Sequence, residues 1–405
     1  MALGRPRRVT NPANIFTRAI LWVAHPKLLW QRTGGMNVLE RQLFTAARAG
    51  LNSIFVAMPE PDDDQLATLR LPPKLELRWV PKDGAAMTEC APPYLGISAD
   101  HFIRVETLAF VARQNFPSSI SYDDASNLSV IQVVLAREDT ISRLRQPLPE
   151  GSYKRLEAPL SQDSIVDWLM VAGPKPQDGF MARHFDRHLS LTASRALLDT
   201  AITPNQMTVF STILGMIGAG FFLGDTRLSY VTGALLVWLH SVLDGCDGEL
   251  ARVRFQESPL GSDLDFCGDN LVHFTLFSCL GLGFWFSGNG IHTLVLSAVA
   301  DAGVLASAWT AWQYRRARRD ESVRGSEAGV VDQPEGDGFE SKLSRVENAL
   351  AQRDFIYLLV LLAFVDMVYE FLWAAAIGGS LFFAIMLFLR RVNHNEQARQ
   401  PHPAS

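Results

Sequence analysis

The chain of 405 residues is 48% hydrophobic and 20% charged, with a formal net charge of −5. This average hides two unlike halves, because residues 1 to about 200 have a soluble composition whereas residues 205 to 392 contain repeated long apolar runs. The four cysteines, at positions 90, 246, 267 and 279, have no paired zinc spacing, and in a reducing compartment they are plain small residues. No nucleic-acid partner is expected. The basic stretch Met1–Arg8 is not promptly followed by an apolar run, so no cleavable signal is expected either.

The first half begins with a strand, a helix and a second strand. Short apolar runs at Ala19–Ala24 and Ser53–Met58 are typical of buried strands, and Asn37–Ala49 between them has helical spacing. This order predicts a cytoplasmic α/β domain over residues 1–173. The stretch GGMNVLERQLFTAARAGLNSIFVA resembles the early part of sugar-phosphate nucleotidyltransferases, in which a helix after a Gly-Gly segment precedes a strand.

The same region departs from those enzymes where they hold their nucleotide. They follow the first strand with a glycine-rich loop and an arginine, and the backbone amides of that loop bind the triphosphate. Here the segment is AHPKLLWQRTGG, with bulky Leu28, Leu29 and Trp30. Asp100 stands where such folds often place a metal-binding aspartate, although a helix cap explains a lone aspartate equally well. We therefore expect a nucleotidyltransferase-like domain without catalysis, with a remaining role in regulation, partner contact or membrane docking.

Residues 174–204 are expected to form a juxtamembrane segment. After a break rich in proline and glycine, FMARHFDRHLSLTASRALLD alternates apolar and basic residues at helical spacing. This pattern predicts an amphipathic helix at the membrane interface, with its arginines toward lipid headgroups. Arg183 and Arg187, one turn apart, are candidates for an acceptor phosphate, with headgroup contact as the alternative.

The second half is predicted to be α-helical and polytopic over residues 205–392. Several of its apolar runs approach the ~20 residues that cross a bilayer. The six candidate spans are Asn205–Leu223, Leu228–Val242, Phe266–Phe286, Ile291–Trp312, Phe355–Trp373 and Ala375–Leu389. The second is short as an apolar run because its helix is expected to continue into the motif that follows. Residues 320–350 predict a cytoplasmic loop with some disorder, and residues 393–405 a loose tail.

Four aspartates lie at fixed spacings in the motif D-x2-D-G-x2-A-R-x8-G-x3-D-x3-D. Its positions form two helical stripes, one of Asp244, Asp247, Gly248, Ala251 and Arg252, the other of Gly261, Asp265 and Asp269. Pro259 between them allows the chain to turn, so the two stripes can face each other. Carboxylates in a membrane segment are costly, and a pair of divalent cations would neutralise them.

The remaining motif residues fit phosphoryl transfer. Gly248 and Ala251 remove bulk from the face that carries the acids, and Arg252 offers a fixed fork to a phosphate oxygen. Enzymes of phosphoryl transfer combine metal ions and an arginine with a space of this kind between small residues. Helix caps and turns explain any one of these residues, but not eight positions in register.

At these residues the sequence resembles the CDP-alcohol phosphatidyltransferase family, and every position of that family's motif is filled. The resemblance implies six transmembrane helices and a two-metal site, where a second alcohol displaces CMP from a CDP-linked alcohol. It implies that two Mg2+ (or Mn2+) ions are held by Asp244, Asp247, Asp265 and Asp269. Asp265 and Asp269 are the catalytic candidates, with Asp269 as general base.

The resemblance also implies a CDP pocket. Its candidate residues are Gly248, Ala251, Arg252 and Gly261, together with the Thr203-Pro204-Asn205 turn. For that turn, a plain helix start with proline in the first turn is an equal alternative.

Lysine and arginine predict the orientation. The connections Gly224–Leu228, Ser287–Gly290 and Ala374–Gly379 contain a single basic residue, Arg227, whereas the opposite side is rich in arginine. Both termini and the motif are therefore expected on the cytoplasmic side of a multi-pass inner-membrane protein. Cytidine nucleotides and Mg2+ are available there.

The substrates stay open. CDP-diacylglycerol is the common donor in the family and would enter from the bilayer, and the acceptor would be an alcohol or a phosphorylated polyol. The domain order resembles bifunctional inositol-1-phosphate cytidylyltransferase/di-inositol-phosphate phosphate synthase enzymes, which favours CDP-inositol with an inositol phosphate acceptor. A non-enzymatic membrane scaffold is the alternative of a different class. A homodimer is expected. Asp366 and Glu370 could line the bundle interior, contact acceptor hydroxyls or form a dimer contact, and the sequence does not decide among these roles.

Overall fold

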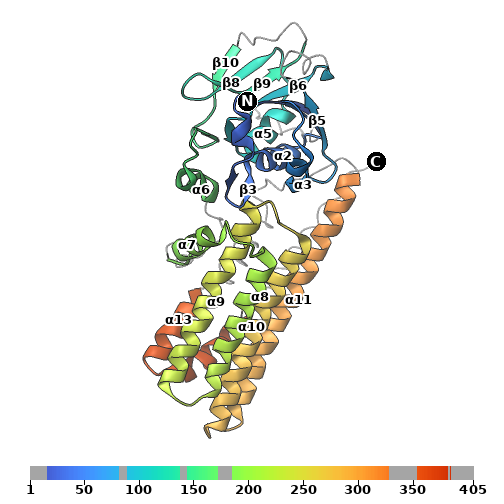
Figure 1. Cartoon of the computed structure of the whole chain (residues 1–405). Coiled ribbons are helices and arrows are strands. Elements are labelled where there is room, and N and C mark those ends of the chain that lie inside the picture. Colours follow the sequence, from blue (N-terminus) through green and yellow to red (C-terminus); the bar gives the residue numbers. More distant parts are fainter. Residues whose placement is uncertain are drawn as a thin grey trace, which may run out of the picture. The chain divides into compact units, whose positions relative to one another are not determined.

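The computed structural model describes residues 16–81, 89–136, 144–171, 185–327, 354–381 and 384 (Figure 1). The chain divides into two compact units, Met1–Ala172 and Gly173–Ser405. The break before the amphipathic segment, Arg183, most of the polar segment before the fifth predicted span and the tail lie outside the described residues.

Unit 1 is built on a seven-stranded sheet. In spatial order its strands are β10 (Leu144–Pro147), β8 (Ile120–Asp123), β9 (Ser129–Val134), β6 (Tyr94–Ser98), β1 (Arg18–Trp22), β4 (Ser53–Ala57) and β5 (Glu76–Val80). Strands β6, β1, β4 and β5 pair in parallel, whereas β9 is antiparallel to both of its neighbours. Parallel pairing requires crossover connections, so this half of the sheet is an α/β layer.

The predicted strand–helix–strand start is confirmed by β1, α2 (Val38–Arg48) and β4. Helix α2 begins after Asn37, whose N–H donates to the Glu40 carboxylate at 3.0 Å in a capping box. The other helices in the described residues of the unit are α1 (Pro26–Leu29), α3 (Asp63–Thr68), α5 (Val105–Arg113) and α6 (Gln162–Met170). Two short antiparallel pairs also belong to it, β7 (His101–Ile103) with β11 (Tyr153–Arg155), and β2 (Arg32–Thr33) with β3 (Met36–Asn37).

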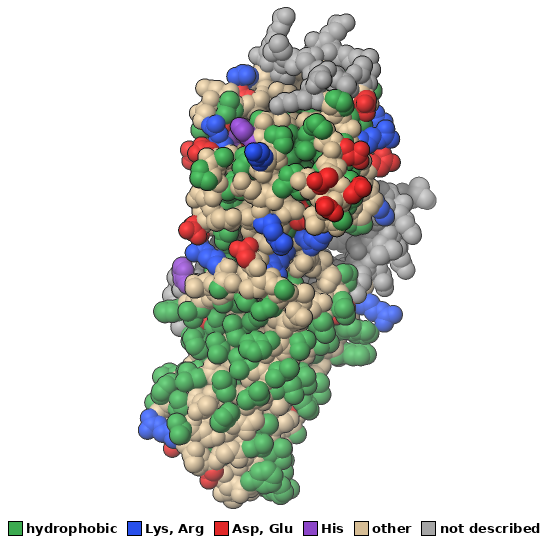
Figure 2. Space-filling view, viewed as in Figure 1, with side chains coloured by type: hydrophobic (Ala, Val, Ile, Leu, Met, Phe, Trp, Pro, Cys, Tyr) green, Lys and Arg blue, Asp and Glu red, His purple; other side chains and the backbone are tan. Residues whose placement is uncertain are grey.

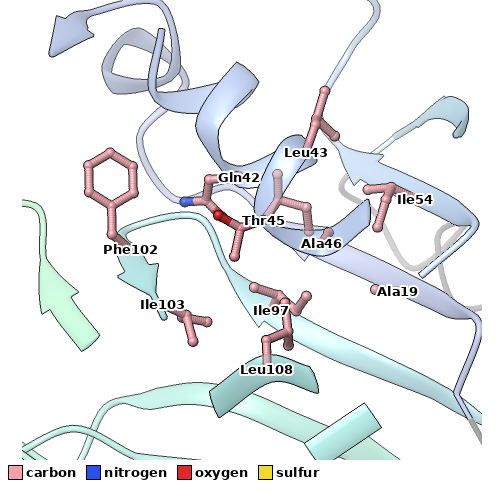
Figure 3. A pocket seen from close by; sticks show the side chains of 11 residues that line it. Ala19, Gln42, Leu43, Thr45, Ala46, Ile54, Ile97, Phe102, Ile103 and Leu108 are labelled. Atoms are coloured by element: carbon pink, nitrogen blue, oxygen red, sulfur yellow. The ribbon is translucent and has the colours of Figure 1, made fainter. Parts of the chain in front are cut away.

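Figure 3 shows the interior between α2 and the sheet. Side chains of α2, among them Gln42 and Ala46, lie over Ile97 and Leu108, around a void of about 20 Å³. The Gln42 amide donates to the Ala99 carbonyl at 2.7 Å, so this polar side chain of the lining is satisfied. The space under α2 is thus packed core with no room for a nucleotide.

Unit 2 is helical. Its elements are α7 (Arg187–Leu197), α8 (Pro204–Gly220), the short 3-10 turn η2 (Phe221–Leu223), α9 (Arg227–Val253), α10 (Pro259–Phe286), α11 (His292–Glu327), α13 (Asp354–Phe364) and an apolar helix over Val368–Leu381. Thr203 caps α8: its hydroxyl accepts from the Gln206 N–H at 3.3 Å, while the Gln206 side chain accepts from the Thr203 N–H at 3.0 Å. The long α9 confirms that the second apolar run continues into the aspartate motif.

On the face shown in Figure 2, hydrophobic side chains cover much of the helices of unit 2. Large hydrophobic side chains such as Phe210, Leu228 and Trp309 are more than half exposed on its helices. Among the residues the structure describes, Pro204–Leu223 and His292–Gln313 are long and apolar enough to cross a membrane, each with a mean hydropathy of 1.5. An exposed apolar surface of this extent is expected for helices that face lipid.

The predicted boundaries of the last two spans are wrong. Phe355–Trp373 is not one helix, because α13 ends at Phe364 and a new helix begins at Val368. Asp366 in the intervening turn has φ +62, a left-handed conformation that ends a helix. The second helix runs through Ala374 to Leu381, where a connection at Ala374–Gly379 was predicted. The connection is at Val365–Met367 instead, and its neighbour Phe364 accepts a hydrogen bond from Arg227.

The start of the predicted polar loop is also different. Helix α11 continues to Glu327, so residues 320–327 are helical rather than loop. Arginine and glutamate favour helices, and nothing in this stretch before Gly325 breaks one.

Candidate metal and nucleotide site

Helices α9 and α10 bring the two stripes of the aspartate motif together. Helix α9 ends at Val253, and Phe255 in the turn has φ +53. Ser258 then caps α10, since its hydroxyl accepts from the Gly261 N–H at 3.0 Å, and Pro259 occupies the first turn. The chain therefore reverses over a few residues, and the motif acids of the two helices face each other.

Three of the four aspartates form one cluster. Each of Asp244, Asp247 and Asp265 offers a carboxylate oxygen, and these oxygens lie within 4.8 Å of one another. Asp244 and Asp247 are buried, with 3% and 6% exposed, and Asp265 is half-buried. Two oxygens bound to one cation at about 2.0–2.6 Å lie no more than about 5 Å apart, so the spacing fits a shared hard cation. Without such a cation, three neighbouring carboxylates would repel one another strongly.

Asp269 stands outside that cluster. It lies one turn beyond Asp265 on α10, with a third of its side chain exposed, and its carboxylate is 3.7 Å from Nε2 of His240. His240 is buried on α9, four residues before Asp244. Gly215 of α8 makes room for it, since a Cβ there would lie 2.8 Å from the imidazole. The acid predicted as general base is thus placed beside a buried imidazole.

A cleft of about 310 Å³ opens next to the cluster. Two cluster members, Asp247 and Asp265, line it, together with a set of motif residues and the start of α8. The predicted nucleotide residues in its lining are Pro204, Asn205, Gly248, Ala251, Arg252 and Gly261. Four further residues from the turn and the start of α10 also line it, namely Gln256, Glu257, Ser258 and Ser262.

The glycines keep this cleft open. A Cβ at Gly261 would lie 3.0 Å from the Asn205 side-chain oxygen, and one at Gly248 would lie 3.1 Å from the Arg252 guanidinium. Thr203 is not in the lining, and its side chain caps α8. The structure therefore divides the Thr203-Pro204-Asn205 turn, with the first residue in a capping role and the next two facing the cleft.

The sequence interpretation missed two neighbours of the acids. His240 was detectable, because it shares the helix face of Asp244 at a spacing of four residues. Thr208 of α8 is buried and donates a hydrogen bond to the Asp247 carboxylate. No spacing rule connects Thr208 to the motif, because α8 meets α9 only in the folded bundle.

Arg187, one of the two candidates for an acceptor phosphate, begins α7 and does not line the cleft. Arg183 lies outside the described residues. Helix α7 packs on α9, where Ser190 and Ser194 donate to the Glu249 carboxylate at 3.0 and 2.7 Å. The acceptor role of the two arginines therefore stays a prediction.

The carboxyl edge of the sheet in unit 1 has a different character. Asp100 follows β6 and lies 3.3 Å from Nδ1 of the exposed His25. The segment after β1 folds into α1, with Leu28 and Leu29 buried, where a phosphate loop would be open. Across the described ranges of both units, Asp244, Asp247 and Asp265 form the only group of three or more candidate metal ligands. Asp100 is not part of such a group.

A buried polar pair lies close to this edge. The Asp124 carboxylate is 3.2 Å from Nε2 of His101 and accepts the N–H groups of Ser126 and Leu128, each at 2.8 Å. Burial lowers the pKa of His101, although the Asp124 carboxylate partly opposes it. Burial raises the pKa of Asp124, but the donors from Leu128, His101 and Ser126 outweigh it and lower the pKa overall. This pair ties β7 to the turn after β8 as a satisfied structural contact.

Comparison with known proteins defines the class. Residues 201–377 match the family described as CDP-alcohol phosphatidyltransferase, so unit 2 carries a domain of this family. The family consists of transferases that are integral to the membrane and metal-dependent. Unit 2 is accordingly a helical, membrane-type domain, and an α/β region precedes it.

Particular relatives come from two groups. A bifunctional IPC transferase and DIPP synthase of Rubrobacter xylanophilus is 38% identical over 125 residues, 31% of this chain and 27% of that protein. A phosphatidylinositol phosphate synthase of Mycobacteroides abscessus is 26% identical over 158 residues, 39% of this chain and 68% of that protein. The matched segments span only 20% to 47% of the lengths of four bifunctional relatives.

A solved structure is also similar. It is phosphatidylinositol phosphate synthase of Mycobacterium tuberculosis with CDP-DAG bound, 17% identical, covering 50% of this chain and 93% of that chain with a TM-score of 0.34.

Proposed function

We propose that the chain is a membrane CDP-alcohol phosphotransferase that moves a phosphoalcohol (phosphatidyl-type) group from a CDP-alcohol to a second alcohol and releases CMP. The observation that carries this proposal is the cluster of Asp244, Asp247 and Asp265 beside a cleft that also contains Arg252. The match of residues 201–377 to the CDP-alcohol phosphatidyltransferase family supports this class of reaction. The cluster and cleft would hold the pyrophosphate of the donor.

The cleft residues would hold the CDP half of the donor. Gly248, Ala251 and Gly261 leave space for cytidine and diphosphate, and Arg252 would donate to a phosphate oxygen. Pro204 and Asn205 would complete the pocket from the first turn of α8. Thr203 would act one step away, by fixing where that helix begins.

The reaction itself needs one proton acceptor and charge neutralisation. Two divalent cations, Mg2+ or Mn2+, held by Asp244, Asp247, Asp265 and Asp269, would neutralise the donor pyrophosphate and the departing CMP. Asp269 would take the proton of the acceptor hydroxyl. The hydroxyl oxygen then bonds to the phosphorus distal to cytidine, and the P–O bond to CMP breaks with its electron pair on CMP.

We propose six membrane-spanning helices, namely α8, α9, α10, α11, α13 and Val368–Leu381, with both termini and the site on the cytoplasmic side. The connections after α8, α10 and α13 lie at the same end of the helix bundle, which we call the distal end, as two contacts indicate. There Arg227 donates to the Phe364 carbonyl, and Nε2 of His292 lies 2.8 Å from the Tyr369 hydroxyl. The distal connections contain few basic residues, as expected for the side away from the cytoplasm.

The remaining parts of the chain have proposed roles of their own. Residues 1–173 would be a nucleotidyltransferase-like domain without catalysis, 174–204 a juxtamembrane segment, 205–392 the phosphotransferase domain and 393–405 a tail. The filled core under α2 and the α1 helix in place of a phosphate loop support the loss of catalysis. A homodimer is part of the proposal, as is a contact of Arg183 and Arg187 with an acceptor phosphate.

Two donors are compatible with the site. CDP-diacylglycerol would enter from the bilayer, and the acceptor would be an alcohol or a phosphorylated polyol. The relatives named bifunctional IPC transferase and DIPP synthase favour the second candidate, transfer from CDP-inositol to an inositol phosphate. If unit 1 is inactive, a separate enzyme must make CDP-inositol.

Product analysis by mass spectrometry tests the proposal. Purified full-length protein in detergent would be incubated with Mg2+ or Mn2+, a panel of CDP-alcohols and candidate acceptors. We expect CMP and one phosphodiester product with a single donor and acceptor pair, which names both substrates. If no pair releases CMP, the proposed enzymatic function is wrong, and a role as a non-enzymatic membrane scaffold is favoured instead.

A further inference from the structure

Arg254 lies within the aspartate motif, two residues after Arg252, at the end of α9. Its side chain is 5% exposed, and its guanidinium points to the turn between α7 and α8 rather than to the cleft. Nε donates to the Leu198 carbonyl at 3.2 Å, and Nη1 donates to the Ile202 carbonyl at 2.6 Å. Nη2 donates to the Leu197, Leu198 and Thr200 carbonyls at 2.6, 2.7 and 3.0 Å. One guanidinium therefore binds four main-chain carbonyls of this turn.

These contacts are more than is needed to satisfy a buried charge. Four carbonyls at and after the end of α7 accept from one planar group with a fixed geometry. Along the same helix, Glu249 binds Ser190 and Ser194 of α7. One face of α9 thus contacts α7 through Glu249, while the face with Asp244 and Asp247 forms the site.

The turn that Arg254 holds leads directly into the cleft. Ile202 is followed by Thr203, which caps α8, and then by Pro204 and Asn205, which line the cleft. Across the cleft, Asn205 lies against Gly261 of α10. The position of the α8 start relative to α9 therefore sets the separation between Asn205 and the Arg252 face of the pocket.

We propose that Arg254 is a positioning residue for the donor nucleotide, acting through the first turn of α8. This inference rests on the proposed function, since it concerns the same cleft. It assigns to Arg254 no contact with substrate. Loss of the Arg254 guanidinium should let the start of α8 shift. The affinity for the cytidine nucleotide should then fall, while the rate of the chemical step should change little.

Kinetics of Arg254→Lys in the full-length enzyme test the proposal. Lysine keeps the charge but cannot reproduce the fork, so we expect KM for the CDP-alcohol to rise on the order of 10-fold with little change in kcat. Arg227→Lys is the matched control, because Arg227 also donates to a main-chain carbonyl but at the distal end of the bundle. A purely structural role would lower the melting temperature and leave KM unchanged, which would overturn the proposal.

A double variant separates positioning from general loosening. If Arg254 acts through Asn205, the effects of Arg254→Lys and Asn205→Ala on KM should not multiply when combined. Multiplied effects would contradict the proposal.

Amide hydrogen exchange of the unmodified protein tests the same link and does not depend on whether a variant folds. Binding of CDP should protect the amides of residues 200–206 as well as those of the α9 end. Protection confined to α9 would contradict the proposed link. Failure of the unmodified enzyme to release CMP would instead count against the proposed function, so the two failures are distinct.

Discussion

The two units of this chain place acidic residues in opposite settings. In unit 2, Asp244, Asp247 and Asp265 converge from two helices, and glycines keep the adjacent cleft open. In unit 1, Asp100 stands beside His25 at a sheet edge, while buried Leu28 and Leu29 occupy the segment where a phosphate loop would lie. An aspartate after a sheet strand, such as Asp100, is therefore not sufficient to identify a phosphoryl-transfer site. Convergent acids and free volume next to them distinguish a candidate phosphoryl-transfer site.

Removal of divalent metal should give the largest effect. Without cations the three carboxylates of the cluster repel one another and the donor pyrophosphate, so CMP release should fall by at least about 1,000-fold. Rates would be measured after chelation and again after Mg2+ or Mn2+ is restored. Full activity of the chelated protein would remove the contrast with unit 1, since neither unit would then need a metal.

A methyl group in the cleft should have the next largest effect. Gly261→Ala places a Cβ 3.0 Å from the Asn205 oxygen, so the pocket must shift, and kcat/KM for the donor should fall roughly 10- to 100-fold. Gly220→Ala is the matched control, because a Cβ there meets no other atom within 4 Å. Equal activity of both alanine variants would show that free volume at Gly261 does not matter.

Acidification should weaken unit 1 through His101. Because burial lowers the pKa of His101 below its ordinary value of 6.5, the unfolded chain binds more protons as the pH falls below that value. Stability should therefore decrease from about pH 6.5 down to the lowered pKa of the folded state. Amide exchange of β7 in the full-length protein would be followed over this range. His101→Gln should flatten the dependence, and an unchanged slope would contradict this account of the pair.

Asp100→Asn should have the smallest effect. If unit 1 has lost catalysis, CMP release from a supplied CDP-alcohol should be the same as in the unmodified enzyme. The unmodified enzyme should also make no CDP-alcohol from CTP and a phosphorylated alcohol. Both products would be measured by chromatography with labelled cytidine nucleotide. Formation of a CDP-alcohol that depends on Asp100 would abolish the contrast between the units.

Local patterns in the sequence predicted much of the fold. Buried apolar runs and a capped amphipathic helix were sufficient for β1, α2 and β4, because each obeys its own periodicity. The break at Val365–Met367 escaped prediction because apolar residues continue on both sides of it. Helix α11 extends past the predicted loop start because charged residues sustain a helix as well as they solvate a loop.

For the candidate site, spacing predicted which acids share a helix face but not every partner. Asp244, Asp247 and Asp265 converge because a short turn joins their helices. The contacts of Asp247 with Thr208 and of Arg254 with the α7–α8 turn depend on how separate helices pack, which no repeat in the sequence encodes. The approach of Asp269 to His240 of α9 likewise depends on how α9 and α10 pack.

The central claim is that the acids shared by α9 and α10 carry the reaction. Asp265→Asn removes one charge from the cluster with almost no change in shape, and Asp263→Asn makes the same change at an exposed position on the same helix. Mg2+-dependent CMP release should be lost by on the order of 1,000-fold in the first variant and retained in the second, with both folded in detergent. Unimpaired CMP release by Asp265→Asn would contradict the account.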